Sequence, residues 1–431
     1  MTDASETPRR RPKPDVMAIG NRKLQPNTLM MGHGFDPALS EGSLKPPIFL
    51  TSTFVFENAA AGKRHFEGVT GKRPGGAEGL VYSRFNGPNQ EIAEDRLGVW
   101  EDAEDALTFS SGMSAIATVL LAFVQPGDVI VHSAPLYAAT ETLIGRILGK
   151  FGVKWLDFPA GATLGEIDAV VEKAQALGRV ALIYLESPAN PTNVLVDVEA
   201  VAKVRDARFG TGEDRPPIVI DNTFLGPLWH KPLAHGADIV VYSLTKYAGG
   251  HSDLVAGGAL GSKAHINTIR AMRNTIGTIL DPNSAWMLLR SLETLELRMS
   301  RAGENAAKIC AWLKDQPKVE KIVYLGFPEN ERQADIYRRH CSGAGSTFSL
   351  YLKGGEAEAF AFLDALKIAK LAVSLGGTET LASCPAAMTH LSVPDDRKAA
   401  LGITPNMVRI SIGVEDADDL IADFEQALAA I

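Results

Sequence analysis

Cysteine is scarce in this sequence, and long hydrophobic runs are absent. The chain of 431 residues has 3 cysteines, Cys310, Cys341 and Cys384, which are far apart and form no C-x-x-C pair. This pattern is typical of a reducing compartment and argues against a disulfide framework or a structural zinc site, so we expect no metal. No stretch approaches the ~20 consecutive apolar residues of a membrane span, and the N-terminus lacks the apolar core of a secretory signal. We therefore expect a cytoplasmic protein with no membrane contact.

An excess of positive charge is also missing. The chain carries 43 basic and 51 acidic residues, a formal net charge of −8. A protein of this sign has no general attraction for a polyanion, which argues against nucleic acid as a partner. The one basic cluster, Arg9 to Arg11 with Lys13, lies in a segment rich in Pro, Thr and Asp. Such a segment is typical of a solvated, poorly ordered tail.

The remaining composition and the order of patterns predict an α/β protein. Hydrophobic residues make up 45% and charged residues 22%, as in ordinary globular chains, and the length predicts two domains. Residues 1–80 are punctuated by prolines and end in a glycine-rich loop, which predicts an extended arm whose first ~20 residues are disordered. We expect a larger domain over 81–285 and a C-terminal α+β domain over 286–431.

Buried strands and helices alternate along the larger domain. Apolar strands bounded by helices indicate a parallel sheet that is covered on both faces. A long helix over 282–316, an alternating strand over 347–352 and a terminal helix over 416–431 belong to the C-terminal domain. In the larger domain we expect strands at 106–110, 129–131, 180–185, 217–220 and 237–243, and helices at 91–104, 115–123, 138–150 and 198–209.

Two segments place polar residues where buried strands end, which is the edge at which open parallel sheets bind ligands. The first, Ser110 to Ser114, is a strand-to-helix junction whose backbone amides can bind a phosphate, although a capping serine gives the same pattern. The second ends in Asp221, an acid that needs a cationic partner in a buried setting unless it caps the next turn.

A lysine completes the pattern. Lys246 follows the buried run Val240 to Tyr242 and is preceded by Ser243-Leu244-Thr245. Its amine is therefore expected to project into the site, where the two hydroxyls can bind an anion. A lysine in such surroundings can have a lowered pKa and form Schiff bases with carbonyls.

Together these segments resemble the transsulfuration family of pyridoxal-phosphate (PLP) enzymes, which includes cystathionine γ-lyase, methionine γ-lyase, cystathionine γ-synthase and the O-acylhomoserine sulfhydrylases. The resemblance runs from about Pro46 to the C-terminus. It implies PLP as cofactor and an aspartate-aminotransferase-like fold (fold type I), in which a mostly parallel seven-stranded sheet with helices on both faces precedes a smaller α+β domain. The matching segments are Tyr82-Ser83-Arg84, Ser111-Gly112-Met113, Leu136-Tyr137, Glu186-Ser187-Pro188-Ala189-Asn190-Pro191, Asp221-Asn222-Thr223, Ser243-Leu244-Thr245-Lys246, Leu295-Glu296-Leu297-Arg298-Met299, Ser374-Leu375-Gly376-Gly377, Met388-Thr389-His390 and Val408-Arg409-Ile410-Ser411.

The resemblance also implies roles in holding the cofactor. Lys246 would carry PLP as an internal aldimine and then move protons, and Asp221 would pair with the pyridine nitrogen. Tyr137 would stack on the ring and transfer a proton to the leaving group. Because two residues would reach the phosphate from a neighbouring subunit, the working unit would be at least a dimer, and the family commonly builds a tetramer as a dimer of dimers. The phosphate site would consist of Gly112, Met113, Ser243 and Thr245, with Tyr82 and Arg84 from the neighbour.

A second set of residues would bind the amino-acid substrate. The resemblance makes Arg409 the clamp for the α-carboxylate, assisted by Asn190 and Ser374 near the carboxylate and the cofactor hydroxyl. Glu379 would lie near the distal end of the substrate. Without the resemblance, Arg409 would be interpreted as a structural ion-pair residue and Asn190 as a turn residue. Structural roles are expected for His251, Cys384 and His390.

The implied reaction is γ-elimination on an L-amino acid with a γ-heteroatom substituent, such as methionine, cystathionine or canavanine, which yields 2-oxobutanoate and ammonia. A γ-replacement transferase, either a cystathionine γ-synthase or an O-acylhomoserine sulfhydrylase, is the alternative. A binding protein with vestigial catalysis is a third hypothesis, which the presence of Lys246, Asp221, Tyr137 and Arg409 disfavours.

Details around the site bear on the substrate. The segment Ser374 to Leu381, with Glu379, resembles the γ-lyases more than the synthases. Ala139 and Arg273-Asn274 stand where methionine γ-lyases carry a cysteine and a Lys-Asp pair, which argues against specificity for methionine. Glu379 and Glu141 together would favour a cationic distal group such as that of canavanine.

Overall fold

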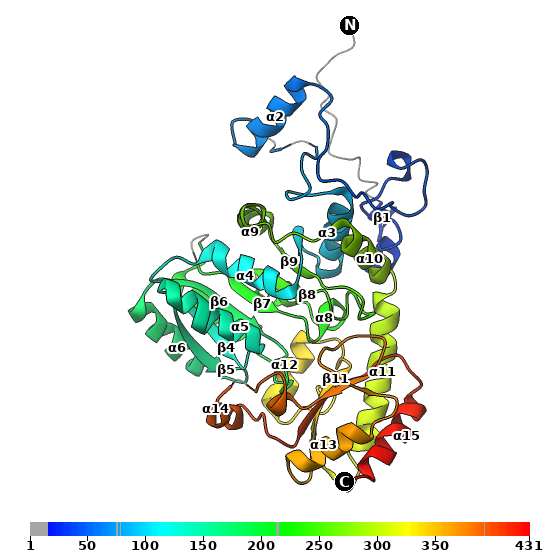
Figure 1. Cartoon of the computed structure of the whole chain (residues 1–431). Coiled ribbons are helices and arrows are strands. Elements are labelled where there is room, and N and C mark those ends of the chain that lie inside the picture. Colours follow the sequence, from blue (N-terminus) through cyan, green and yellow to red (C-terminus); the bar gives the residue numbers. More distant parts are fainter. Residues whose placement is uncertain (1–15, 75, 78, 213–214, 392) are drawn as a thin grey trace.

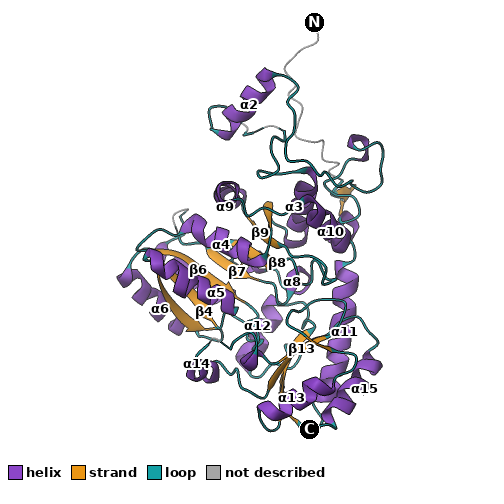
Figure 2. Ribbon diagram, viewed as in Figure 1, coloured by secondary structure: helices purple, strands orange, loops and turns teal. Residues whose placement is uncertain are grey.

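The computed structural model describes residues 16–74, 76–77, 79–212, 215–391 and 393–431. The basic cluster at residues 9–13 and most of the predicted disordered stretch lie outside the described residues. Among the helices of the described ranges, none has both the length and the apolar character that crossing a membrane requires. Figures 1 and 2 show a larger sheet region and a smaller one, with the N-terminal segment standing at the opposite end from the C-terminus.

The larger sheet has seven strands, of which six share one direction. Its order is β3 (Asp105–Phe109), β9 (Gly257–Gly261), β8 (Ile239–Ser243), β7 (Ile218–Asp221), β6 (Val180–Glu186), β4 (Val129–Ala134) and β5 (Lys154–Pro159). The pairs from β8 to β5 are parallel, whereas β9 runs antiparallel to both β3 and β8. The predicted mostly parallel seven-stranded sheet is therefore confirmed.

Helices cover both faces of this sheet. They are α3 (Pro88–Glu101), α4 (Gly112–Phe123), α5 (Ala138–Thr142), α6 (Leu164–Leu177), α7 (Val198–Phe209), α8 (Gly226–Trp229), α9 (Lys263–Ile276) and α10 (Pro282–Leu292). Ile220 and Val240 pack in one core layer with α3, α6, α7 and α10, and Val219 and Val241 pack in the other with α4 and α9. Successive residues of a strand point to opposite faces of the sheet. A sheet with helices on both faces therefore needs strands that are apolar at every position.

The smaller sheet has five strands. Their order is β10 (Val319–Val323), β11 (Thr347–Leu352), β14 (Met407–Ser411), β13 (Leu381–Ser383) and β12 (Lys370–Leu371). The helices of this region are α11 (Leu295–Leu313), α12 (Glu331–His340), α13 (Glu356–Ala365), α14 (Asp395–Ala400) and α15 (Ala417–Leu428). Phe348 and Leu350 of β11 pack with Phe362 of α13 and Phe424 of α15 in a separate core.

The single helix predicted over 282–316 is two helices, α10 and α11, with Glu293 and Thr294 between them. The side chain of Arg298 donates a hydrogen bond of 2.9 Å to the carbonyl of Ser291, so this carbonyl has a partner where the first helix ends. Figure 1 shows α11 running from the larger sheet region along the smaller one. The predicted domain boundary at residues 285 and 286 falls inside α10, and the division into domains stays a prediction.

The N-terminal segment holds few elements. They are β1 (Ala18–Ile19), β2 (Arg22–Lys23), α1 (Pro26–Leu29) and α2 (Ala59–Val69). Helix α2 stands away from the rest of the chain in Figure 1. Leu44, Leu50 and Val55 are 82%, 76% and 95% exposed. Large apolar side chains gathered on one exposed segment are typical of an interaction surface.

Candidate active site

The N-terminus of α4 lies directly against the end of β8. A Cβ atom on Gly112 would come 2.8 Å from Cβ and 3.1 Å from Oγ of Ser243, so only glycine permits this approach. Ser111 caps the helix, because its side chain accepts a hydrogen bond of 3.0 Å from the amide of Ser114. The first amides of a helix have no partner within the helix and carry partial positive charge. The amides of Gly112 and Met113 thus lie in the position expected for a phosphate site.

Lys246 follows β8 and reaches the segment between β12 and β13, next to the smaller sheet. Its Nζ donates a hydrogen bond of 2.7 Å to Oγ of Ser374. Burial, and secondarily the positive charge of Arg409, lower the pKa of Lys246 to about 8. A neutral amine that can bond to a carbonyl carbon or take up a proton is therefore accessible close to neutral pH.

Ser374 joins Lys246 to Arg409. Its backbone φ is 111°, which side chains other than glycine rarely adopt and which marks a residue held by its surroundings. The carbonyl of Ser374 accepts a hydrogen bond of 2.8 Å from Arg409, and Oδ1 of Asn190 accepts another of 3.1 Å. Arg409 is therefore in direct contact with Ser374 and Asn190, two of the three other predicted substrate residues.

Arg409 has one N–H group that is not used in a hydrogen bond among the described residues. It lies buried on β14, and its Nε has no hydrogen-bond partner among the described residues. Burial lowers the pKa of Arg409 to about 10, which leaves the guanidinium charged at neutral pH. A buried planar cation with an unused N–H suits a bidentate carboxylate.

Asp221 and Glu186 lie side by side at the ends of two parallel strands, because the register of β6 and β7 pairs them. Burial raises the pKa of Asp221. The hydrogen bond of 2.9 Å that the amide of Thr223 donates to this carboxylate lowers the pKa, but by less. Burial, and then the charge of Asp221, raise the pKa of Glu186 well above its usual range. A cation placed beside Asp221 would relieve this penalty.

Glu186 is a site residue that the sequence reasoning did not single out. Its two carboxylate oxygens accept hydrogen bonds of 2.9 Å from the amide of Asn190 and 2.6 Å from the amide of Tyr137. It thereby fixes the backbone of two predicted site residues at once. The signal that could have found it is the one that marked Asp221, an acid that closes an otherwise apolar strand.

Tyr137 and Thr245, two further predicted cofactor-binding residues, lie close to Glu186 and Lys246. Tyr137 immediately precedes α5, and 41% of its surface is exposed. The hydroxyl of Thr245 donates to the carbonyl of Ala256 at 3.2 Å and accepts from its amide at 3.1 Å, which anchors the turn that carries Lys246.

Tyr82 and Arg84 make their contacts elsewhere. The Arg84 guanidinium lies 4.6 Å from the centre of the Phe85 ring, and it donates to the carbonyl of Asn274. Tyr82 is 40% exposed and packs edge-on against Phe85. Neither described contact joins these side chains to the Lys246 region of the same chain.

The acidic residues predicted at the distal end of the substrate have partners within the chain. Glu379 accepts hydrogen bonds from the hydroxyl of Ser252 and, at 3.3 Å, from that of Thr378. Glu141 lies 3.7 Å from a guanidinium nitrogen of Arg397. The Arg397 guanidinium reduces the negative charge that Glu141 offers to a cationic substrate, whereas Glu379 has only neutral partners among these contacts.

The residues expected to be structural have local partners. His251 Nδ1 lies 2.8 Å from the carbonyl of Gly249, and His390 Nδ1 lies 2.9 Å from the hydroxyl of Thr389. The thiol of Cys384 donates to the carbonyl of Pro405 at 3.6 Å. All three cysteine thiols are free.

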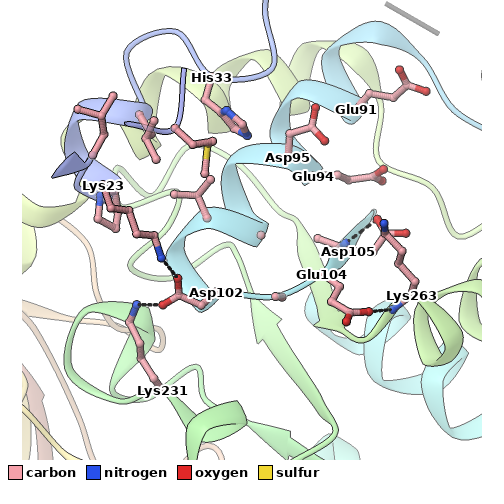
Figure 3. A pocket seen from close by; sticks show the side chains of 18 of the residues that line it. Lys23, His33, Glu91, Glu94, Asp95, Asp102, Glu104, Asp105, Lys231 and Lys263 are labelled. Carbon is pink, nitrogen blue, oxygen red and sulfur yellow. Dashed lines mark hydrogen bonds and ion pairs between the residues drawn. The ribbon is translucent and has the colours of Figure 1, made fainter. Parts of the chain in front are cut away.

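A separate cavity lies between the N-terminal segment and α3. It has a volume of about 700 Å³, and its described lining contains none of the predicted site residues. Figure 3 shows Asp102 between Lys23 and Lys231, which lie 3.2 Å and 3.2 Å from its carboxylate oxygens. Because none of the predicted site residues lines this cavity, and its residues Asp102 and Asp105 pair with basic side chains, the region around Lys246 is the candidate active site.

The residues around Lys246 fit PLP. The phosphate matches the amides at the start of α4, and the protonated ring nitrogen matches the buried carboxylate of Asp221. The aldehyde matches an amine whose pKa is lowered, and the carboxylate of an amino acid matches the spare donor of Arg409.

Comparison with known proteins agrees with this fit. The family profile described as Cys/Met metabolism PLP-dependent enzyme matches residues 27–429. L-methionine gamma-lyase from Pseudomonas putida is 38% identical over 408 residues, 94% of this chain and 97% of the relative. O-succinylhomoserine sulfhydrylase from Pseudomonas aeruginosa is 33% identical over 391 residues, 91% of this chain and 92% of the relative.

Two further relatives extend the comparison. Cystathionine gamma-lyase from Dictyostelium discoideum is 33% identical over 410 residues, 95% of this chain and 98% of the relative. The crystal structure of metB from Corynebacterium glutamicum superposes with a TM-score of 0.83 at 32% identity, covering 94% of this chain and 98% of that one. The predicted family, fold type and cofactor are thus confirmed, and the chain belongs to the PLP-dependent enzymes of Cys/Met metabolism.

Proposed function

We propose that this protein is a lyase that carries out γ-elimination on an L-amino acid with a γ-heteroatom substituent, such as methionine, cystathionine or canavanine. The observation that carries the proposal is the hydrogen bond of 2.7 Å between Lys246 and Ser374, whose carbonyl in turn binds the Arg409 guanidinium. A base and a carboxylate clamp are thereby joined through one residue. The relatives named L-methionine gamma-lyase and cystathionine gamma-lyase support the lyase branch.

In this proposal Arg409 and Asn190 hold the α-carboxylate, which fixes the amino acid relative to Lys246. The bound PLP supplies an electron sink for the charge that develops when protons leave the substrate. Lys246 would take the proton from Cα, give it up again, and then take the proton from Cβ before it returns protons as the product forms. Ser374 orients the amine during these transfers.

The other site residues hold the cofactor and assist the leaving group. Asp221 keeps the proton on the ring nitrogen, and Glu186 positions the backbones of Tyr137 and Asn190. Tyr137 would stack on the bound ring and would give a proton to the departing γ-substituent. The phosphate-binding residues are Gly112, Met113, Ser243 and Thr245.

Specificity for methionine is not part of the proposal. Arg273, one of the departures from the methionine γ-lyases, is buried and forms an ion pair of 2.7 Å with Glu94. It also donates to the carbonyls of Thr108 and Phe85. This departure therefore concerns the packing of α9 against α3 and β3, and Glu379 is the distal residue that remains for substrate choice.

We propose a second copy of the chain as partner. Tyr82 and Arg84, away from their own Lys246, would complete the phosphate site of the neighbour, and the exposed Leu44, Leu50 and Val55 would be covered at the same interface. The assembly would be a tetramer built as a dimer of dimers, located in the cytoplasm.

The alternative is γ-replacement, supported by the relative named O-succinylhomoserine sulfhydrylase. Purified holoprotein mixed separately with methionine, cystathionine, canavanine, O-acetylhomoserine and O-succinylhomoserine separates the two reactions. Lyase activity yields 2-oxobutanoate from one substrate well above the others with no thiol added. A thioether or homocysteine that forms only with added cysteine or sulfide would establish the transferase instead.

A further inference from the structure

Histidines and carboxylates gather where α7, the 3-10 helix Pro232–His235 and the end of α12 meet. Nδ1 of His235 lies 3.1 Å from Oε1 of Glu199. Nε2 of His340 lies 4.0 Å from the same oxygen and 3.8 Å from Oδ1 of Asp197. The rings of His235 and His340 stack with their centres 4.3 Å apart. None of these residues belongs to the set that we propose for PLP or substrate.

We propose that Glu199, His235 and His340 bind a divalent transition-metal ion such as Zn²⁺. One ligand atom from each of the three lies within 4.8 Å of the others. In a tetrahedral zinc site with bonds of ~2.0–2.2 Å, ligand atoms lie roughly 3.3–3.5 Å apart, so movements of less than about 1 Å would close the site. Asp197 can supply the fourth position.

The ligand types select the class of metal. Imidazole suits Zn²⁺, Cu²⁺ and Ni²⁺, whereas Mg²⁺ and Ca²⁺ prefer sites made of oxygen atoms alone. Nδ1 of His340 has no hydrogen-bond partner among the described residues, so no bond from this atom fixes the ring.

Arg339 bonds to the same two carboxylates. Its guanidinium donates to Glu199 at 2.7 Å and to Asp197 at 2.8 Å, and it lies 3.1 Å from Nε2 of His340. It also bonds to Asp335 at 3.0 Å on the exposed side. Arg339 can therefore turn toward Asp335 and leave both carboxylates to the ion. Because the metal ion and the guanidinium compete for these carboxylates, removal of the guanidinium should strengthen metal binding.

The test is a titration of the holoenzyme with Zn²⁺ by isothermal calorimetry. Wild type should bind one ion per chain at this site. His235→Asn and Glu199→Gln should each weaken binding by at least about tenfold, because each removes a ligand. His265→Gln, a matched change of a partly buried histidine on α9, should leave the affinity unchanged.

Misfolding could also weaken binding in the ligand variants, so a variant with the opposite effect is needed. Arg339→Gln removes the competing guanidinium and should bind Zn²⁺ several-fold more tightly than wild type. Tighter binding of one ion per chain is not the result of a loss of structure, which would instead expose scattered histidines and cysteines as several sites. Zn²⁺ should also raise the melting temperature of wild type and Arg339→Gln but not of Glu199→Gln. Equal affinity in wild type, His235→Asn and Glu199→Gln, or no binding by wild type, would overturn the proposal.

Discussion

Several ionisable side chains of the candidate site are buried. Burial disfavours the charged forms of Lys246 and Arg409, and the charge of Arg409 further disfavours that of Lys246. Burial likewise disfavours the charged forms of Asp221 and Glu186, and the charge of Asp221 adds to this effect at Glu186. Within the described chain, these four side chains do not form ion pairs with one another, as a purely structural network would. The site is therefore organised to receive the charges of a cofactor and a substrate.

The lowered pKa of Lys246 predicts how the apoprotein takes up PLP. The amine is protonated below pH 8 and neutral above it, and only the neutral amine attacks the aldehyde. The rate of PLP uptake, followed by cofactor absorbance, should rise about tenfold per pH unit up to about pH 8 and then level off. Arg409→Met removes a neighbouring positive charge and should shift the midpoint to higher pH, whereas Arg409→Lys should not. A rate that is the same from about pH 6 to about pH 9 would refute this account.

Ser374 should affect catalysis through its hydroxyl and stability through its backbone. Ser374→Ala removes the hydrogen bond to Lys246 and should lower kcat about tenfold with little change in KM, since a hydrogen bond to a charged group contributes ~1.5–3 kcal/mol. Ser374→Gly loses the same hydroxyl but accepts the φ of 111°, so it should be about 1 kcal/mol more stable to denaturant than Ser374→Ala. Unchanged kcat in both variants would show that the hydroxyl has no catalytic part.

Among the elements, α4 and β8 define the phosphate site by their close approach. Gly112→Ala would force a Cβ to within 2.8 Å of Ser243, so the two elements must separate. The dissociation constant of PLP, measured by equilibrium dialysis, should increase at least about tenfold. Gly165→Ala, in the first turn of α6 with open space around it, is the matched control and should bind PLP as wild type does. An equal loss in both variants would point to general destabilisation.

The sequence predicted the elements that apolar periodicity marks and missed those that packing alone explains. The helix predicted over 198–209 is α7, and the strand that closes at Asp221 is β7. Strand β9 was not predicted, because three of its five residues are glycines and glycine is rare in strands. A Cβ on Gly257 would come 2.1 Å from the carbonyl of Ser111, so the glycine serves the neighbouring helix start rather than the strand.

Contacts between distant parts of the chain were beyond prediction from the residues alone. Lys246 and Ser374 are 128 positions apart, and no local pattern indicates their hydrogen bond. The same is true of Glu186, whose partners Tyr137 and Asn190 come from two different loops. Family resemblance named most of these residues, but only the fold shows which of them touch.

For the whole molecule, the exposed N-terminal segment and the location of Tyr82 and Arg84 predict active sites shared between two chains. Arg84→Ala and Lys246→Ala should each be nearly inactive alone. Co-expressed, they should form hybrid dimers in which one of two sites is native, which restores about a quarter of the wild-type activity. Absence of any recovery, with hybrids verified by two affinity tags, would mean that each chain completes its own site.

The most direct test of the central claim is the rate of 2-oxobutanoate release by wild type and Lys246→Ala, each loaded with PLP and given the best substrate without any thiol. The account predicts steady release by wild type and a decrease of at least about 10²–10⁴-fold in the variant, because the group that moves the protons is gone. Release that survives the loss of Lys246, or that requires an added nucleophile in wild type, would contradict γ-elimination at this site.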